Sequence, residues 1–222
     1  MANNEQSGKT LVHEDRITLN LLDVVNENSA ITQRSLAVEL GVALGLTNSY
    51  LKRCVRKGLI KIQQVPSNRY TYYLTPRGFS EKSRLTAEYL KQSFDFFRLA
   101  RKQSLDLLQS CIDQDLKRIA LTGKSDLTEI TILSATELKV ELTGIIDADA
   151  AITTSNYLNL PVVSKPAKLG PIHALIVTDM NTPQYTFDQA TKFFPTEKVL
   201  TVPILGVKRN NHHHINNLRN TA

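Results

Sequence analysis

The chain has 222 residues, enough for one large or two modest domains, and 41% of them are hydrophobic. Its formal charge of +6 and pI near 9.3 fit a negatively charged partner. No apolar run approaches ~20 residues, which argues against a membrane-spanning helix, and the polar start lacks the apolar core of a signal peptide. Two cysteines are too few for a disulfide framework, and we expect a cytoplasmic protein.

The most informative segment lies between Glu39 and Glu81, where the sequence has no Asp or Glu. Charge of one sign adds little to fold stability but raises affinity for a polyanion such as DNA. A winged helix used for protein contacts, with solvated charges, is the competing interpretation. The charged residues of the segment are all basic: Lys52, Arg53, Arg56, Lys57, Lys61, Arg69 and Arg77.

Three helices and a hairpin are predicted around this segment. The apolar spacing predicts a first helix from about Glu14, after a flexible N-terminus over residues 1–13. Thr32 is a candidate N-cap for the second helix, and Gly41 is a candidate C′ residue at its end. Beyond Gly58 the apolar period changes to that of strands. The expected ranges are helices 14–25, 33–40 and 46–57 and strands 59–65 and 69–74.

This order, followed by Leu-Thr-Pro-Arg-Gly at residues 74–78, resembles the MarR-type winged-helix regulators over about residues 14–113. The resemblance implies a winged helix-turn-helix DNA-binding domain over 14–78. It also implies that the third helix enters the major groove of double-stranded DNA and that an Arg of the wing reaches the minor groove. The acidic residue that usually precedes this Arg is replaced by Ser67-Asn68. The implied DNA-binding residues are Asn48, Ser49, Lys52, Arg53, Arg56 and Arg69.

A long helix is expected over residues 79–113, which contain no proline or glycine. Apolar residues recur there at near-helical spacing from Leu85 to Ile112. Such a helix is about 50 Å long, and one winged helix cannot cover that much apolar surface. We expect it to serve as a dimerisation and linker helix that pairs with a second copy and forms a homodimer. The alternative is that the helix breaks and packs on the second domain.

From about residue 116 strands alternate with helices, which predicts a small parallel-sheet domain over 116–206 and a flexible tail over 207–222. Asp126 and Glu129 have the spacing of a capping box. The fold class is therefore α/β overall: an N-terminal winged helix, a long connecting helix and a C-terminal Rossmann-like parallel sheet. The expected strands are 118–122, 140–146, 161–163, 173–177 and 198–201, and the expected helices are 126–138 and 182–194.

The order of strand, glycine turn, helix, strand and terminal carboxylate resembles Rossmann-type nucleotide-binding domains over about residues 117–202. The resemblance implies a ligand beyond the carboxyl ends of the strands: a nucleotide, NAD or a nucleotide sugar. The motif is degenerate, because Ser125 and Thr128 stand where its second and third glycines are expected. A domain that has no ligand and serves assembly is the alternative. The candidate ligand-binding residues are Gly123, Ser125, Asp147, Asp149 and Asp179.

The sequence gives little support for an enzymatic function, because it shows no Ser/His/Asp set, Cys/His pair or HExxH spacing. The two halves together predict a homodimeric, sequence-specific DNA-binding transcriptional regulator that senses a nucleotide-type metabolite. The layout resembles Rex-type redox repressors, which join a winged helix to a Rossmann domain. The alternative from another class is an enzyme of nucleotide-sugar metabolism whose winged helix serves assembly.

Overall fold

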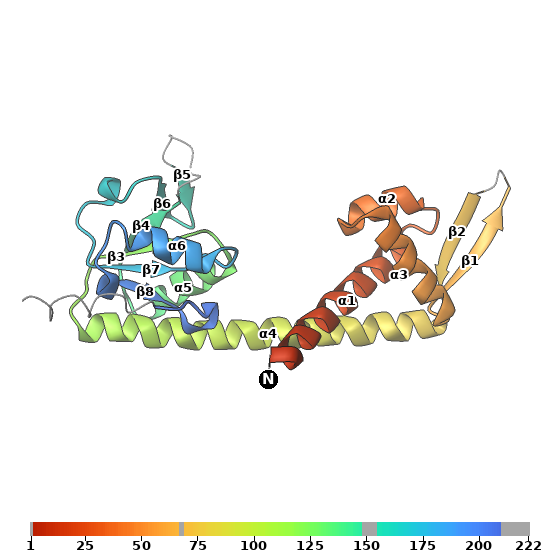
Figure 1. Cartoon of the computed structure of the whole chain (residues 1–222), viewed down its shortest axis with the longest axis horizontal. Helices are drawn as coiled ribbons and strands as arrows, with labels where there is room; N and C mark the ends of the chain where they lie inside the picture. Colours follow the sequence, from red (N-terminus) through yellow and green to blue (C-terminus); the bar gives the residue numbers. More distant parts are fainter. Residues whose placement is uncertain (1, 67–68, 148–154, 210–222) are drawn as a thin grey trace, which may run out of the picture. The chain divides into compact units, whose positions relative to one another are not determined.

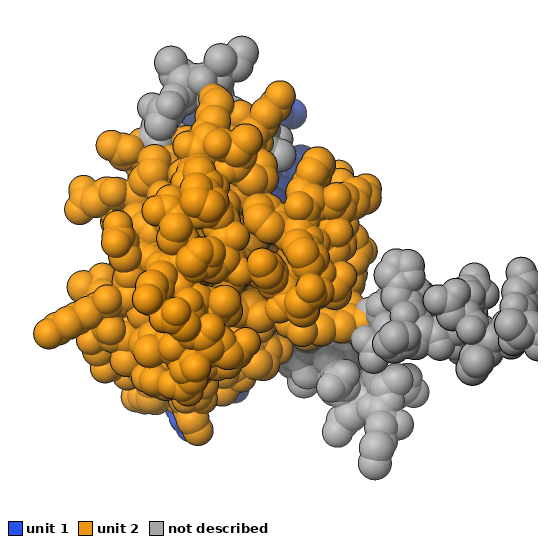
Figure 2. Space-filling model, turned by 90° about the vertical axis from the view of Figure 1, so that its left-hand side faces the viewer, with its two compact units in different colours: residues 1–94 blue, residues 95–222 orange. Residues whose placement is uncertain are grey.

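A computed structural model describes residues 2–66, 69–147 and 155–209, with side chains from residue 14 onward except that of Ser155. The chain divides into two compact units, residues 1–94 and 95–222, which Figure 2 draws in blue and orange. Each unit has its own buried apolar core. None of the helices in the described ranges combines the length and the hydropathy of a membrane span.

The N-terminal unit consists of helices followed by a two-stranded antiparallel hairpin (Figure 1). Helix α1 begins at Ala2 and so includes residues of the segment 1–13 that the sequence predicts to be flexible. No proline precedes Pro66 in the sequence, and a single Gly8 inside a helix costs only about 1 kcal/mol. The elements are α1 (Ala2–Glu27), α2 (Gln33–Leu40), α3 (Leu44–Arg56), β1 (Ile60–Val65) and β2 (Arg69–Leu74).

Local signals fix the ends of α2, as the sequence predicts. The Thr32 side chain accepts a hydrogen bond from the Ser35 backbone N–H at 3.1 Å, which satisfies one free donor of the first turn. Gly41 ends the helix with a φ of 62°, a left-handed conformation that glycine adopts without strain. Helix α3 begins at Leu44, slightly before the expected start. The core that these helices share includes Leu21, Leu22, Leu36, Leu51 and Cys54.

A hydrogen-bonded joint connects the hairpin to the next helix, α4 (Pro76–Asp113). The Thr75 hydroxyl donates to the Gly58 carbonyl at 2.6 Å and accepts from the Gly78 N–H at 3.0 Å. A Cβ at Gly78 would collide with the backbone carbonyl oxygen of Leu59. Glycine is therefore required there, because any larger residue would force the start of α4 away from β1.

Helix α4 is continuous over 38 residues and does not break, contrary to the alternative that the sequence left open. Its first part is packed in the N-terminal unit, where Leu85 is buried and the Lys82 ammonium lies 2.8 Å from Asp23 of α1. Its last part is packed in the C-terminal unit, where Ala100, Leu108 and Cys111 are buried. The boundary between the two units falls within α4, after Phe94.

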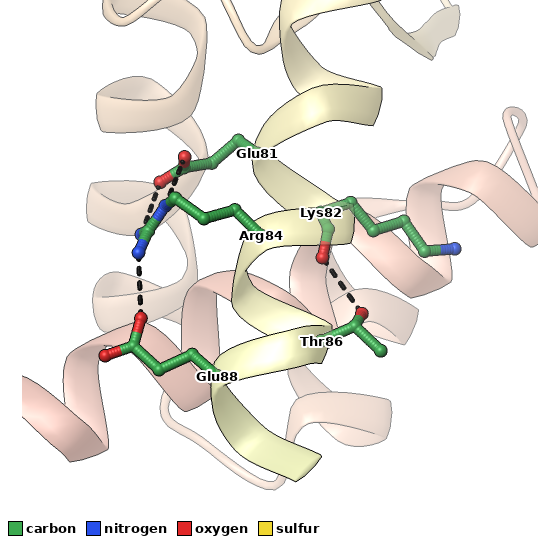
Figure 3. Close-up of polar contacts among 5 residues, drawn as sticks. All are labelled: Glu81, Lys82, Arg84, Thr86 and Glu88. Carbon is green, nitrogen blue, oxygen red and sulfur yellow. Dashed lines mark hydrogen bonds and ion pairs between the residues drawn. The ribbon is translucent and has the colours of Figure 1, made fainter. Parts of the chain in front are cut away.

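Ion pairs along the surface of α4 support its first turns. Figure 3 shows the Arg84 guanidinium between Glu81 and Glu88, with donor–acceptor distances of 2.9 Å to Glu81 Oε2 and 2.8 Å to Glu88 Oε2. These residues are three and four positions apart, so they lie on one side of the helix. The bond from Arg84 is the largest cause that lowers the pKa of the Glu81 carboxyl below its ordinary value.

The C-terminal unit is built on a six-stranded sheet in the order β5-β6-β4-β3-β7-β8. All neighbouring strands are parallel except β5, which is antiparallel to β6 at the edge. The expected fold class, with a parallel sheet in the C-terminal domain, is confirmed. The elements are β3 (Ile119–Thr122), α5 (Asp126–Glu137), β4 (Leu142–Ile146), β5 (Ser155–Tyr157), β6 (Leu160–Val163), η1 (Pro166–Leu169), β7 (Ala174–Val177), α6 (Pro183–Ala190) and β8 (Val199–Thr201).

Helical segments cover both faces of this sheet, because successive side chains of a strand point to opposite faces. Ile119 and Leu121 of β3 join the core beneath α5 and the last part of α4. Ala120, between them, joins the other core, which contains Phe187 of α6 and Leu169 of η1. Burial on both faces explains why the central strands read as short uninterrupted apolar runs.

Three further details differ from the sequence predictions. Strand β5 was not predicted, and it adds an antiparallel edge to the sheet. Helix α6 ends at Ala190 rather than near Phe194. Pro195 has no N–H to donate to the Thr191 carbonyl and disfavours helical backbone at Phe194, which together disfavour a helix over these last residues. Two residues of the expected flexible tail, 207–222, are hydrogen-bonded to the C-terminal unit: the Lys208 N–H donates to Gln184 Oε1 at 2.9 Å, and Arg209 Nη2 donates to the Val199 carbonyl at 3.1 Å. The rest of that tail, 210–222, lies outside the described residues.

Candidate nucleic-acid interface and ligand crevice

Helix α3 presents an exposed stripe on the side opposite its buried residues. The buried side consists of Thr47, Tyr50, Leu51 and Cys54. Positions four, three and four residues apart share one helix face, and four of the exposed positions of α3 follow that spacing. They are Gly45, Ser49, Lys52 and Arg56; Leu44 and Leu46, on either side of Gly45, are exposed as well. Two of the predicted DNA-binding cations, Lys52 and Arg56, therefore lie together on the outer side of α3.

Arg53, a third predicted DNA-binding residue, points elsewhere. Its Nη1 lies 2.9 Å from Glu14 Oε2 of α1, and its guanidinium stacks 4.4 Å from the centroid of the Tyr50 ring. Its side chain is 28% exposed. This arginine therefore helps to hold α3 against α1. The sequence could not indicate that role, because the pair joins residues 39 positions apart.

The two remaining predicted residues of α3 differ from each other in exposure. Ser49 is exposed, and its hydroxyl donates to the Gly45 carbonyl at 3.0 Å. Asn48 is only half-exposed, and its Oδ1 is buried with no hydrogen-bond partner among the described residues. An unpaired buried amide oxygen is costly and requires an explanation. Ser49 stands in the outer stripe, whereas Asn48 lies beside it.

The hairpin carries the last of these predicted residues. Arg69 is exposed at the start of β2, paired in register with Val65 on the other side of the turn. The replaced acidic position, Ser67-Asn68, lies outside the described residues. Tyr72 is buried in the core of the unit, while Tyr70 and Tyr73 are exposed. The hairpin therefore has one face packed on the helices and one exposed face that includes cationic and aromatic side chains.

The C-terminal unit has a hollow of about 1260 Å³ at the carboxyl ends of its parallel strands. In chain order the five parallel strands are arranged 3-2-1-4-5 across the sheet, so β3 and β7 flank the point where the order reverses. Open α/β sheets bind ligands in the crevice at such a point. Of the five predicted ligand-binding residues, Gly123, Asp147 and Asp179 line this hollow. Asp149 lies outside the described residues.

Gly123 has a packing role at this crevice. It ends β3 with a φ of 92°, and a Cβ built on it would come within 2.6 Å of the Asp179 Cβ. The glycine therefore lets the segment after β7 lie directly against the turn after β3. Asp179 therefore covers Gly123 on the side where a Cβ would stand.

Ser125 caps α5 instead of facing the hollow. Its Oγ accepts from the Leu127 N–H at 3.2 Å and donates to the Thr178 carbonyl at 2.5 Å. The Thr128 hydroxyl accepts from the Ser125 N–H at 3.1 Å, which completes a capping box. The capping box predicted for Asp126 and Glu129 is therefore wrong by one residue. The N-cap is Ser125, whose hydroxyl accepts from an N–H of the first turn, and the N3 residue is Thr128.

Opposite charges meet where β3 and β4 end. Lys124 Nζ lies 3.0 Å from Asp147 Oδ2, and the Asp147 side chain is only 16% exposed. Lys165, in the loop after β6, also lines the hollow. Apolar and aromatic side chains from η1, α6 and the turn after α6 form much of the remaining wall, among them Pro166, Tyr185 and Phe193. The crevice thus combines two carboxylates, two ammonium groups and planar apolar surface, which are groups that a polar organic ligand can use.

Asp179 holds the start of α6. Its carboxylate accepts from the Asn181 N–H at 2.8 Å, the Thr182 hydroxyl at 2.9 Å and the Thr186 hydroxyl at 2.6 Å. Partial burial pushes the pKa of Asp179 upward, but the bonds from Thr186, Asn181 and Thr182 outweigh it and leave the pKa below its ordinary value. The carboxylate therefore has a structural role at the edge of the hollow.

Replacement of this carboxylate is expected to destabilise the C-terminal unit. Asp179→Ala keeps the Cβ that covers Gly123 but removes the carboxylate that accepts from Asn181, Thr182 and Thr186, at a cost of about 1–2 kcal/mol. Because the folded-state pKa is depressed, this contribution is present above the unfolded pKa of about 3.9 and is lost as pH falls through the folded value. Urea unfolding should show a gap between parent and variant at pH 7 that narrows below pH 4. Asp188→Ala, which removes an exposed α6 carboxylate bonded to Gln184, should leave stability nearly unchanged.

Three helices followed by a hairpin define the class of the N-terminal unit as a winged helix-turn-helix. Residues 14–61 match the family model described as winged helix-turn-helix DNA-binding. One similar solved structure is the PcaV transcriptional regulator from Streptomyces coelicolor, with 20% identity, a TM-score of 0.36, and coverage of 45% of this chain and 77% of that one. Another is Streptococcus pneumoniae FabT in complex with DNA, with 21% identity, a TM-score of 0.28, and coverage of 55% and 69%. The comparison with curated proteins gives no match.

Proposed function

We propose that this protein is a sequence-specific DNA-binding transcriptional regulator that contacts double-stranded DNA through α3 and the β1–β2 wing. The observation that carries the proposal is the exposed stripe of α3 with Lys52 and Arg56, in a segment without acidic residues between Glu39 and Glu81. A helix of this kind fits the major groove, and its cations can contact phosphates and base edges. The match of residues 14–61 to a winged helix-turn-helix model supports the same conclusion.

The proposal includes a homodimer held by α4. Leu90, Phe94 and Phe97 are four and three residues apart, share one helix face, and are 47%, 56% and 38% exposed. Further along α4, Leu108 and Cys111 are already covered by the chain's own sheet domain. The exposed apolar face of α4 around Phe94 is thus the part available to a second copy. Dimers of this type place two recognition helices on one duplex.

The finer proposal for the C-terminal unit is that it is Rossmann-like and binds a nucleotide-type effector in the crevice. The reversal of strand order and the placement of Asp147 at the end of β4 support it, since a carboxylate there can accept from ribose hydroxyls. The Gly123 N–H donates to the Ile146 carbonyl, and the Ser125 and Leu127 N–H groups are bonded within the capping box, so these backbone donors are not open to a phosphate. Lys124 and Lys165 are the groups that can hold a phosphate.

The decisive experiment compares two arginines of α3 on DNA selected from a random library. Arg56→Ala is expected to weaken binding by about 1–3 kcal/mol if Arg56 reads a base, or to reduce the salt slope by about one if it contacts a phosphate. Arg53→Ala is expected to lower the stability of the N-terminal unit by roughly 1 kcal/mol, because the Glu14 pair and the Tyr50 stacking are lost. Fluorescence anisotropy at several salt concentrations and thermal unfolding measure the two effects.

Lys139→Ala is a control for the loss of one positive charge, since Lys139 is exposed in the C-terminal unit. It should alter neither DNA affinity nor salt slope. If selection yields no preferred DNA, or if Arg56→Ala binds it as tightly as the parent at every salt concentration, the interface proposal is wrong.

A further inference from the structure

The first turn of α3 is apolar and exposed, and the fold gives no reason for it. Leu44 and Leu46 are 42% and 44% exposed. Between them stands Gly45, where an added Cβ would meet no atom of the chain within 4 Å. Glycine in a helix costs about 1 kcal/mol relative to alanine, and exposed leucines bury little surface. Neither leucine belongs to the core of the N-terminal unit or is among the residues packed against it.

The first turn of α3 adjoins the basic stripe of the same helix, which indicates the kind of partner that covers both. Gly45 begins the exposed stripe that continues through Ser49 to Lys52 and Arg56, and the two leucines stand on either side of it. The cations of the stripe have no acidic counterpart between Glu39 and Glu81, so charge complementarity favours a polyanion over an apolar protein surface. The apolar turn is thus continuous with the surface that carries the basic residues.

We propose that Leu44, Gly45 and Leu46 form a specificity-determining surface that recognises the C5-methyl groups of thymine in the major groove. This inference rests on the proposed DNA-binding function. Thymine presents the apolar group of the major groove, and N-terminal residues of recognition helices contact base edges. Leucine cannot form hydrogen bonds to bases, so its discrimination must come from such a methyl group. Gly45 lets a base edge approach the helix backbone without obstruction.

Deoxyuridine tests this directly, because it differs from thymidine only in lacking the methyl group. In a selected operator, each thymine is replaced in turn by deoxyuridine and the affinity is measured. Loss of one buried methyl contact should weaken binding roughly fourfold at one or two positions. In Leu44→Ala and Leu46→Ala proteins the penalty should vanish at the position that each leucine contacts. Leu133→Ala, which truncates a similarly exposed leucine on α5, should keep every penalty.

Gly45→Ala is expected to change protein stability and DNA affinity in opposite directions. It should raise the unfolding temperature of the N-terminal unit, because alanine favours the helix, while weakening operator binding at least about fivefold. Equal affinity for thymine and deoxyuridine at every position would overturn the inference and leave the proposed function intact. The same holds if the penalties persist in both leucine variants, or if Gly45→Ala binds as tightly as the parent. A parent protein that binds no DNA would instead refute the proposed function itself.

Discussion

A protein with Phe94→Glu and Phe97→Glu is expected to be monomeric and to bind a two-half-site operator about a hundredfold or more weakly than the parent. Both rings lie on the exposed apolar face of α4, and paired helices would bury them where a carboxylate has no partner. Joining two binding modules raises affinity by about 10²–10⁴ without any new contact, and the monomer loses that gain. Light scattering gives the mass, and anisotropy gives the affinity for one and two half-sites.

Leu99→Glu provides the matched control on the same helix. Leu99 is 47% exposed but lies two positions after Phe97, on a different side of α4. The Leu99→Glu substitution adds one negative charge outside the proposed dimer face, so the mass and the operator affinity of this variant should stay close to those of the parent. A Phe94/Phe97 variant that is monomeric yet binds the full operator like the parent would contradict the dimer proposal.

The second large effect is expected from a ligand in the crevice of the C-terminal unit. A nucleotide-type compound at a hundred times its dissociation constant should stabilise the unit by about 2.7 kcal/mol. Thermal unfolding across NAD, NADH, nucleoside phosphates and nucleotide sugars measures this shift. Asp147→Ala should abolish it, because this carboxylate lines the hollow at the end of β4.

Asp106→Ala serves as the control for that variant, since Asp106 is an exposed carboxylate of α4 that is not among the residues lining the hollow. It should leave the ligand-induced shift unchanged. If no compound raises the unfolding temperature of the parent, the effector proposal is refuted and the assembly interpretation of this domain stands.

The fold was predictable from sequence where local chemistry determines it. Gly41 adopts the left-handed conformation that its position after α2 predicts, and Thr32 makes the expected cap. The central strands also follow from their short apolar runs, because a strand buried on both faces needs apolar residues at every position. Strand β5 left no comparable signal, since it is a three-residue edge strand whose pairing with β6 depends on the turn between them.

The site was less predictable, because residue type does not determine which partner a side chain finds. Arg53 resembles the other cations of α3 in sequence, yet Glu14 lies close enough in the folded unit to pair with it. Asp179 and Ser125 have the positions expected of ligand-binding residues. In the structure Ser125 accepts from the Leu127 N–H of α5, and Asp179 accepts from the Asn181 N–H and from the hydroxyls of Thr182 and Thr186. Hydrogen bonds over a few residues can be predicted, whereas pairs across the fold require the structure.

The close contact between Gly78 and the Leu59 backbone limits where residues can be inserted into the wing and α4. Because the backbone of Leu59 rests directly on Gly78, the hairpin cannot shift relative to the first turn of α4 without breaking that contact. In a dimer paired through α4, the helix between Gly78 and Leu90 would then set how the two wings are spaced and rotated. One inserted residue there advances the helix by about 1.5 Å and turns it by about 100°. Changes in length between relatives should therefore be found in the turn of the wing, and in α4 only as whole helical turns.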